Sequence, residues 1–190
     1  MDEMVSLFLM GQREFGARLA EITDDQWNGP TVDDDWDVAA LVDHLIDEQR
    51  WLGPLVSGQS LAAAGEAVEA MGPAASDRAG AWEKASTSAA SALSSAGLDG
   101  EVELSRGMTP TRGYVGEMIF DLTVHSWDLG QAIGSTRPFP DELIEPVYAL
   151  VQQYGDLTAF PGAMFKAAVA VPDDAPTVDK LIGLTGRNPH

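Results

Sequence analysis

The residues of this sequence best suited to metal binding or catalysis are histidines and an aspartate that recur at helical spacing. The chain has three histidines, which are His44, His125 and the terminal His190. Asp121 precedes His125 by four residues, so the two side chains lie on the same face of a helix. We set His190 aside because chain ends fray. An imidazole and a carboxylate on one helix face can bind a metal ion or pair with each other.

Both internal histidines lie within apolar helical patterns, which directs them toward the interior of a protein. The apolar residues that surround them at helical steps are Leu41, Leu45, Met118, Leu122 and Leu129. A neutral polar group that is buried without a partner costs on the order of 2–7 kcal/mol. The three polar side chains in these seams therefore need partners, from each other or from a ligand.

Two readings satisfy these side chains, and their spacing does not decide between them. In the first, Asp121 hydrogen-bonds His125, and His44 caps a backbone carbonyl. In the second, His44, Asp121 and His125 hold one divalent metal ion. Two nitrogens and one oxygen from two helices form a usual catalytic zinc set, which leaves a fourth position open for water or substrate.

Further residues near these histidines are weaker candidates for a role in the site. Glu48 follows His44 by four residues, and Asp128 follows His125 by three. Either carboxylate could orient a ligand or act in catalysis. Trp51 and Trp127 are candidate walls of a pocket, although an aromatic residue at helical spacing is more often part of the core.

Helical periodicity dominates the chain and predicts the elements that position these residues. Asp37 is the expected N-cap of the helix that carries His44. Residues 58–76 are expected to form a long connection with a short helix, and residues 101–104 a short extended stretch. The expected helices cover residues 1–22, 77–96, about 112–133, 140–155 and 177–184, and the helix that starts near 36–37 has a break or kink near its end at Gly53–Pro54. The pattern predicts an all-α bundle of four main helices.

Charge and composition exclude several classes of function. The chain has 190 residues, with 30 acidic against 11 basic residues and a net charge of −19. Nucleic acids and anionic membranes need cationic surfaces, so neither is an expected partner. Cysteine is absent, which excludes disulfides, thiolate zinc clusters and a thiol nucleophile from the chain itself. Without a signal peptide or an apolar run long enough to span a membrane, we expect a cytoplasmic protein.

Three blocks of sequence, taken in order, resemble a known family. They are WDVAALVDHL at 36–45, DLTVHSWDLGQAIG at 121–134 and DKLIGLTGRNP at 179–189. Together they make the chain resemble the DinB-like metal-binding superfamily, and within it the N-terminal domain of mycothiol-dependent maleylpyruvate isomerase. The resemblance covers most of the chain. It implies a single domain over 1–190, a DinB-like four-helix bundle with extra short helices and a C-terminal tail.

The resemblance also implies a metal site and its ligands. The family's histidine on the early helix corresponds to His44, and its acidic residue and following histidine correspond to Asp121 and His125. The isomerase has glutamate where this chain has the shorter Asp121. Zinc is the expected ion, with nickel as the alternative, because two histidines and one carboxylate suit several metals. The superfamily also makes a homodimer plausible.

The function that the resemblance implies is a metal-dependent transferase or isomerase that uses a small thiol of the mycothiol type. Its partners would be that thiol and a small electrophile. The isomerase has a second, C-terminal domain, and this chain ends shortly after the bundle, so we do not expect maleylpyruvate isomerisation. A non-catalytic metal-binding or stress-associated bundle is the main alternative. A helical interaction protein with an internally paired polar core and no metal is the third.

Overall fold

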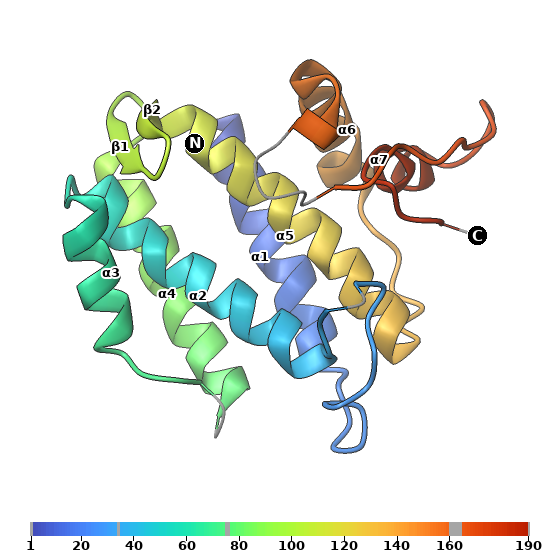
Figure 1. Ribbon diagram of the computed structural model, residues 1–190, viewed down its shortest axis with the longest axis horizontal. Coiled ribbons are helices and arrows are strands. Elements are labelled where there is room, and N and C mark those ends of the chain that lie inside the picture. The colour runs from blue at the N-terminus through green and yellow to red at the C-terminus, as the bar shows by residue number, and fades with distance from the viewer. Residues whose placement is uncertain (1, 34, 75–76, 160–164, 190) are drawn as a thin grey trace. The chain divides into compact units, whose positions relative to one another are not determined.

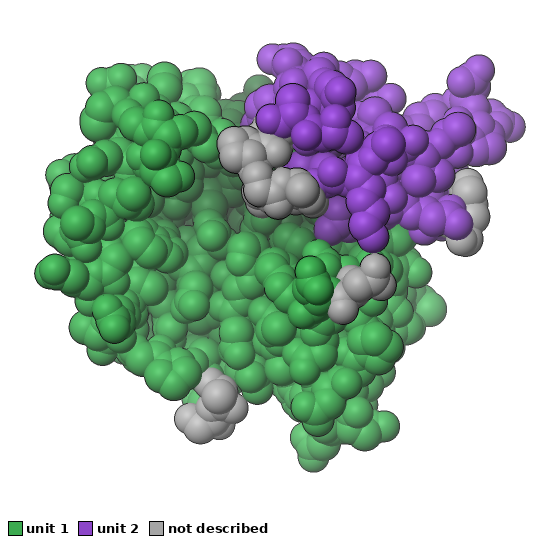
Figure 2. Space-filling model, viewed as in Figure 1, with its two compact units in different colours: residues 1–136 green, residues 137–190 purple. Residues whose placement is uncertain are grey.

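The computed structural model describes residues 2–33, 35–74, 77–159 and 165–189. The chain divides into two compact units, residues 1–136 and residues 137–190 (Figure 2). Each unit is described separately below. Whether a single domain spans 1–190 stays a prediction.

Four long helices build the first unit into a bundle (Figure 1). The helices α1 and α5 pack together, as do α2 with α4, α2 with α5, and α1 with α4. Each helix of the bundle therefore contacts two others. A shorter helix, α3, packs on α2. The bounds are α1 Glu3–Leu19, α2 Val38–Val56, α3 Leu61–Glu69, α4 Arg78–Ala96 and α5 Thr111–Ile133.

A small antiparallel hairpin precedes α5. Its strands are β1, Glu101–Leu104, and β2, Gly107–Pro110, with Leu104 opposite Gly107. The sequence pattern predicted the first strand and not the second. The reason is that β2 spans only four residues and includes glycine and proline, which are depleted in strands.

Side-chain caps define where the helices begin. The Asp37 carboxylate accepts a hydrogen bond from the Ala40 amide at the start of α2, as the sequence predicted. Asp2, Ser60 and Asp77 cap α1, α3 and α4 in the same way. Such a cap contributes about 0.5–2 kcal/mol to stability. Gly134, with φ of 69°, ends α5 in the left-handed conformation that glycine adopts without strain.

The expected break at Gly53–Pro54 does not end α2. Pro54 lies inside the helix, which continues to Val56. Proline lacks an amide hydrogen, so the last turn of α2 loses the bond to the carbonyl of Arg50. Leu52 and Leu55 on either side of it are buried and hold this last turn against the core.

The core of the first unit is apolar. Its helices approach each other closely where a glycine of one helix lies against a large side chain of another. A Cβ atom added at Gly11 would lie 3.2 Å from the Cβ of Leu122, so α1 and α5 approach closely there. One added at Gly16 would lie 2.7 Å from the indole nitrogen of Trp82 on α4. The largest fully buried apolar side chains are Phe8, Phe15, Leu41, Leu45, Ile46, Leu52, Leu55, Leu93, Ile119, Leu122 and Leu129.

The second unit contains α6, Asp141–Tyr154, a short 3-10 helix, Leu157–Ala159, and α7, Thr177–Leu184. The helices α6 and α7 pack together, and the Thr177 hydroxyl donates to the Glu145 carboxylate at 2.6 Å. Across the described residues of both units, no helix is long and apolar enough to cross a membrane. The dominance of helices confirms the predicted all-α class.

Candidate metal centre

The structure brings together the three side chains that the sequence singled out as ligands. His44 lies on α2, and Asp121 and His125 lie on α5. The Nε2 atom of His44 is 3.5 Å from Oδ1 of Asp121, and Nε2 of His125 is 3.3 Å from the same oxygen. One ligand atom from each residue lies within 4.8 Å of the others. We call these three residues the metal cluster.

These separations fit metal coordination better than direct hydrogen bonding. An N–H···O bond to a charged group is normally about 2.7–2.9 Å long. In a tetrahedral zinc site with bonds of about 2.0–2.1 Å, neighbouring ligand atoms are about 3.3–3.4 Å apart. Both nitrogen–oxygen distances to Asp121 lie near that second value.

Two atoms of the metal cluster are buried and have no hydrogen-bond partner. They are Nε2 of His44 and Oδ2 of Asp121. The side chains of His44, Asp121 and His125 are 25%, 20% and 11% exposed, so the cluster is shielded but reachable. Two histidine nitrogens and a carboxylate oxygen that converge in this way are suited to a divalent cation.

The direction of the two helices explains why the ligands meet. The helices α2 and α5 pack together and run in opposite directions (Figure 1). Leu45 on α2 and Leu122 on α5, each next to a candidate ligand in sequence, are fully buried and fix their helices in the core. Thr123 and Ser126 are also buried on α5, but each hydroxyl donates to a carbonyl of its own helix. They are therefore already satisfied.

Asp128 contacts His125 from outside the metal cluster. Its Oδ2 lies 2.9 Å from Nδ1 of His125, and the carboxylate is fully buried. A carboxylate on Nδ1 favours the tautomer with the proton there, which leaves Nε2 free to bind a metal. The structure thus gives Asp128 the orienting position that its spacing suggested.

Burial and neighbouring charges shift the pKa values of Asp121 and His125 in opposite directions. Burial alone would raise the pKa of Asp121, but His125 and His44 hold it well below its usual range. Burial likewise opposes a charge on His125, yet Asp121 and Asp128 raise its pKa to about 9. An imidazolium and a carboxylate therefore neutralise each other here, and a metal ion would displace the proton.

Glu48 lies near the metal cluster without joining it. Burial raises the pKa of its carboxyl to about 7, and repulsion from Asp121 adds to this, while His44 and His125 act in the opposite direction. Among the described residues, the group with metal-ligand geometry consists of His44, Asp121 and His125. Glu48 is therefore a neighbouring acid whose catalytic role stays a prediction.

The aromatic residue at the metal cluster is Trp36, which the sequence analysis did not select. Its ring centroid lies 4.7 Å from that of His44 and 5.4 Å from that of His125. Hydrogen bonds from the Thr31 amide and hydroxyl to its carbonyl hold the loop that carries it. Trp36 could have been selected from its position just before the N-cap Asp37, because an apolar residue at that position often packs on the following helix.

Trp51 and Trp127, which were predicted as pocket walls, occupy other environments. The ring of Trp51 lies against α3, where a Cβ atom at Gly65 would be 3.1 Å from it. Trp127 is buried and follows His125 by two residues, which turns it about 200° around α5. Their role as walls of a ligand pocket stays a prediction.

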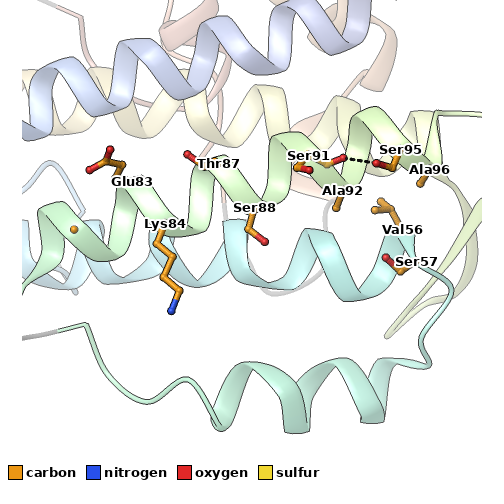
Figure 3. Close-up of a pocket in the computed structure, with 11 residues that line it drawn as sticks. Val56, Ser57, Glu83, Lys84, Thr87, Ser88, Ser91, Ala92, Ser95 and Ala96 are labelled. Atoms are coloured by element: carbon orange, nitrogen blue, oxygen red, sulfur yellow. Dashed lines mark hydrogen bonds between the residues drawn. The ribbon is translucent and has the colours of Figure 1, made fainter.

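A hollow of about 990 Å³ lies on another part of the first unit, along α4 and the end of α2 (Figure 3). Small polar and apolar side chains line it, with Lys84 projecting from α4. None of the three residues of the metal cluster is among its lining residues. The hollow and the candidate metal centre are therefore separate features of the first unit.

The fold and the site together define a helical bundle with a two-histidine, one-carboxylate cluster between antiparallel helices. Residues 9–130 match the family described as the mycothiol maleylpyruvate isomerase N-terminal domain. This match covers more than half of the chain, so the chain belongs to this family. The match confirms the resemblance that the three sequence blocks predicted.

Similar proteins are found among curated sequences and solved structures. Two uncharacterized proteins of Mycobacterium tuberculosis, from strains CDC 1551 / Oshkosh and H37Rv, are 27% identical over 179 residues, which is 93% of this chain and 93% of each relative. Crystal structures of mycothiol-dependent maleylpyruvate isomerase and of a mutant match with a TM-score of 0.59 and 14% identity, over 77% of this chain and 67% of theirs. At that identity the likeness shows a common fold.

Proposed function

We propose that this protein binds one divalent metal ion, zinc with nickel as the alternative, through His44, Asp121 and His125. It uses the ion to bind a small thiol of the mycothiol type and directs the thiolate at a small electrophile. The observation that carries this proposal is the spacing of the ligand atoms, at 3.3 Å and 3.5 Å around one oxygen of Asp121. The unpartnered Nε2 of His44 supports it.

The choice of a thiol rests on the family and on the composition. The solved isomerases of similar fold are described as mycothiol-dependent. This chain has no cysteine, so a sulfur nucleophile must come from a cofactor. A bound divalent cation lowers the pKa of a coordinated thiol and so favours the reactive thiolate. We expect the reducing cytoplasm as the compartment, because small thiols stay reduced there.

The chain's own residues would position the reactants. Asp128 keeps the proton of His125 on Nδ1 and aims Nε2 at the ion. Asp121 supplies the anionic ligand, and three protein ligands leave a position for the thiol. Trp36 covers the imidazoles and restricts the approach of water.

The reaction itself is either a transfer or an isomerisation. In a transfer, the thiolate sulfur forms a bond to the electrophilic carbon, and the leaving group departs with the electron pair. In an isomerisation, the sulfur–carbon bond forms and later breaks, which returns the thiol unchanged. In both cases the thiol's proton passes to solvent or to a nearby carboxylate when the thiolate forms.

A second candidate function is a metal-binding module without turnover, and Glu48 is the observation that favours it. Its carboxyl is close enough for Asp121, His44 and His125 to shift its pKa. If Glu48 swings in as a fourth ligand, the site becomes closed, as structural zinc sites are. Visible absorption of the cobalt-loaded chain separates the two functions, since an added thiol changes the spectrum of an open site and not of a closed one.

Elemental analysis of the purified chain tests the proposal first. We expect about one divalent ion per chain, and loss of that ion in the His125→Ala and Asp121→Ala variants. The His190→Ala variant is the matched control, because it removes the one histidine of the sequence that is not a candidate ligand. An absence of metal after reconstitution with excess zinc or nickel would instead support an internally paired polar core.

A further inference from the structure

A buried hydroxyl without a partner lies on the same helix as the metal ligands. Tyr114 is 5% exposed, and its hydroxyl oxygen is buried with no hydrogen-bond partner. The neighbouring polar residues of α5 differ in this respect, because Thr123 and Ser126 bond to carbonyls of their own helix. A phenol is too long and too rigid to do the same. Its hydroxyl is therefore free to bond a ligand.

The antiparallel packing of α2 and α5 puts Tyr114 on the Glu48 side of the metal cluster. Along α2, Glu48 lies one turn beyond His44, which is about 6 Å. Along α5, Tyr114 lies two turns before Asp121, which is the same direction in space (Figure 1). After burial, the charges of Glu48 and Asp121 are the largest influences that raise the pKa of Tyr114. Seven residues make almost two full turns and four make just over one turn, so Tyr114 and Glu48 lie on the same helix faces as Asp121 and His44.

Acidic groups surround this position, because Glu48, Asp121 and Glu117 all raise the pKa of Tyr114. In the described part of the first unit, the cation tied to these acids is Arg106, which is already paired with Glu117. Five of the seven cationic side chains of this unit pair with carboxylates; they are Arg18, Arg50, Arg78, Arg106 and Arg112. The other two, Arg13 and Lys84, are exposed on α1 and α4, outside the pair of helices that carries the metal cluster. The proposed divalent ion would be neutralised by Asp121 and the bound thiolate, so a ligand carboxylate beside Glu48 and Tyr114 would meet net repulsion.

We propose that the Tyr114 hydroxyl and the Glu48 carboxyl form a polar subsite beside the metal cluster, which binds an uncharged oxygen-bearing group of the ligand. A hydroxyl can accept a hydrogen bond from Tyr114 and donate one to Glu48, whereas a carboxylate can only accept. The subsite therefore selects neutral hydroxyl or carbonyl groups against carboxylates. This inference rests on the proposed metal-and-thiol function and specifies which ligands that function accepts.

Three-carbon thiols that carry two hydroxyls, no polar group or a carboxylate beyond the sulfur-bearing carbon test the subsite. The probes are 1-thioglycerol, propane-1-thiol and 3-mercaptopropionate, titrated into the cobalt-loaded chain and followed by the sulfur-to-cobalt charge-transfer absorption. We expect thioglycerol to bind about fivefold to tenfold more tightly than propanethiol, which corresponds to one net hydrogen bond. Mercaptopropionate is expected to bind more weakly than both.

Variants assign the preference to the two residues. Tyr114→Phe is expected to remove the advantage of thioglycerol while leaving metal content and propanethiol affinity unchanged. Glu48→Gln is expected to reduce the discrimination against mercaptopropionate. Tyr148→Phe on α6 is the matched control. Because the variant phenylalanine loses only an unpartnered oxygen, the melting temperature of the metal-free Tyr114→Phe chain should be equal to that of the wild type or higher.

The outcomes separate this inference from the function on which it rests. If the wild-type chain takes up one ion and all three thiols bind equally, or Tyr114→Phe behaves as the wild type, the subsite is wrong and the metal site stands. Tighter binding of mercaptopropionate than of thioglycerol would also overturn the subsite. If no metal binds, the proposed function and the subsite both fail.

Discussion

Two neighbouring residues on α2, Asp43 and His44, illustrate the difference between a completed ion pair and an interaction that leaves a buried atom without a partner. Asp43 receives two hydrogen bonds of 2.8 Å from the guanidinium of Arg78, which also lies 5.2 Å from the centre of the Trp27 ring. His44 approaches its carboxylate, Asp121, only to 3.5 Å, and its Nε2 has no hydrogen-bond partner.

The difference lies in what each pair satisfies. The fork of Arg78 uses both oxygens of Asp43, so that pair needs nothing further and ties α4 to α2. The metal cluster leaves a nitrogen and an oxygen buried and unused, which a folded protein tolerates only when another group binds them. We therefore expect changes at Asp43 and Arg78 to affect stability alone, and changes at His44 and its partners to affect metal binding.

Metal removal from the cluster of His44, Asp121 and His125 should change stability more than any other test of this comparison. Chelation is expected to lower the free energy of unfolding by about 3–4 kcal/mol when the free ion had been roughly 100 to 1,000 times above its Kd. Urea denaturation with and without chelator measures this. The His125→Ala variant is the control, because its stability should not respond to chelator. An equal response in both proteins would place the stabilising metal somewhere else.

The metal-free chain should lose stability at high pH. Burial opposes a charge on His125, but Asp121 and Asp128 raise its pKa to about 9. Its contribution is thus present below the ordinary histidine pKa of about 6.5 and is lost as pH rises through about 9, by on the order of 1–3 kcal/mol. Denaturation at several alkaline pH values measures the loss. A metal-loaded chain should not show it, because the ion replaces the proton.

The Asp128→Asn variant should weaken metal binding without abolishing it. The amide keeps the shape of the carboxylate but loses its charge, so Nδ1 of His125 is held less firmly. We expect a 10- to 100-fold loss of metal affinity. Competition with a chromophoric chelator measures it. An unchanged affinity would mean that the hydrogen bond of 2.9 Å does not orient the ligand.

The Arg78→Ala variant tests the completed interaction and should give the smallest effect. Losing the fork and the contact with Trp27 is expected to cost about 1–2 kcal/mol, between the values for exposed ion pairs and for buried hydrogen bonds to charged groups. Metal content should stay at the wild-type level. If the Arg78→Ala variant lost its metal, the Asp43–Arg78 pair and the metal cluster would be coupled through α2.

The sequence predicted well which residues lie together on one face of a helix. Asp121 and His125 follow from a four-residue step, Asp128 from a three-residue step, and His44 from its place in an apolar stripe. Local periodicity fixes which face of a helix a residue occupies. The bundle class followed from the same periodicity.

Relations between separate elements were harder to predict. Trp36 reaches the metal cluster from a loop, and no periodicity extends to a residue outside the helix. Tyr114 lies one turn before the seam recognised at Met118, so extending that seam backward would have found it. Its missing partner, however, depends on how α2 and α5 pack. The second strand, Gly107–Pro110, was missed because four residues with glycine and proline carry little strand signal.

The position of Trp36 gives the protein a built-in optical signal. An indole whose ring centre lies 4.7 Å and 5.4 Å from two imidazoles loses fluorescence to a protonated imidazole by electron transfer. Replacing the proton on His125 with a metal ion changes that quenching. We therefore expect metal binding to change the fluorescence of Trp36, on top of the emission of the other four tryptophans, so that binding can be followed without an added label.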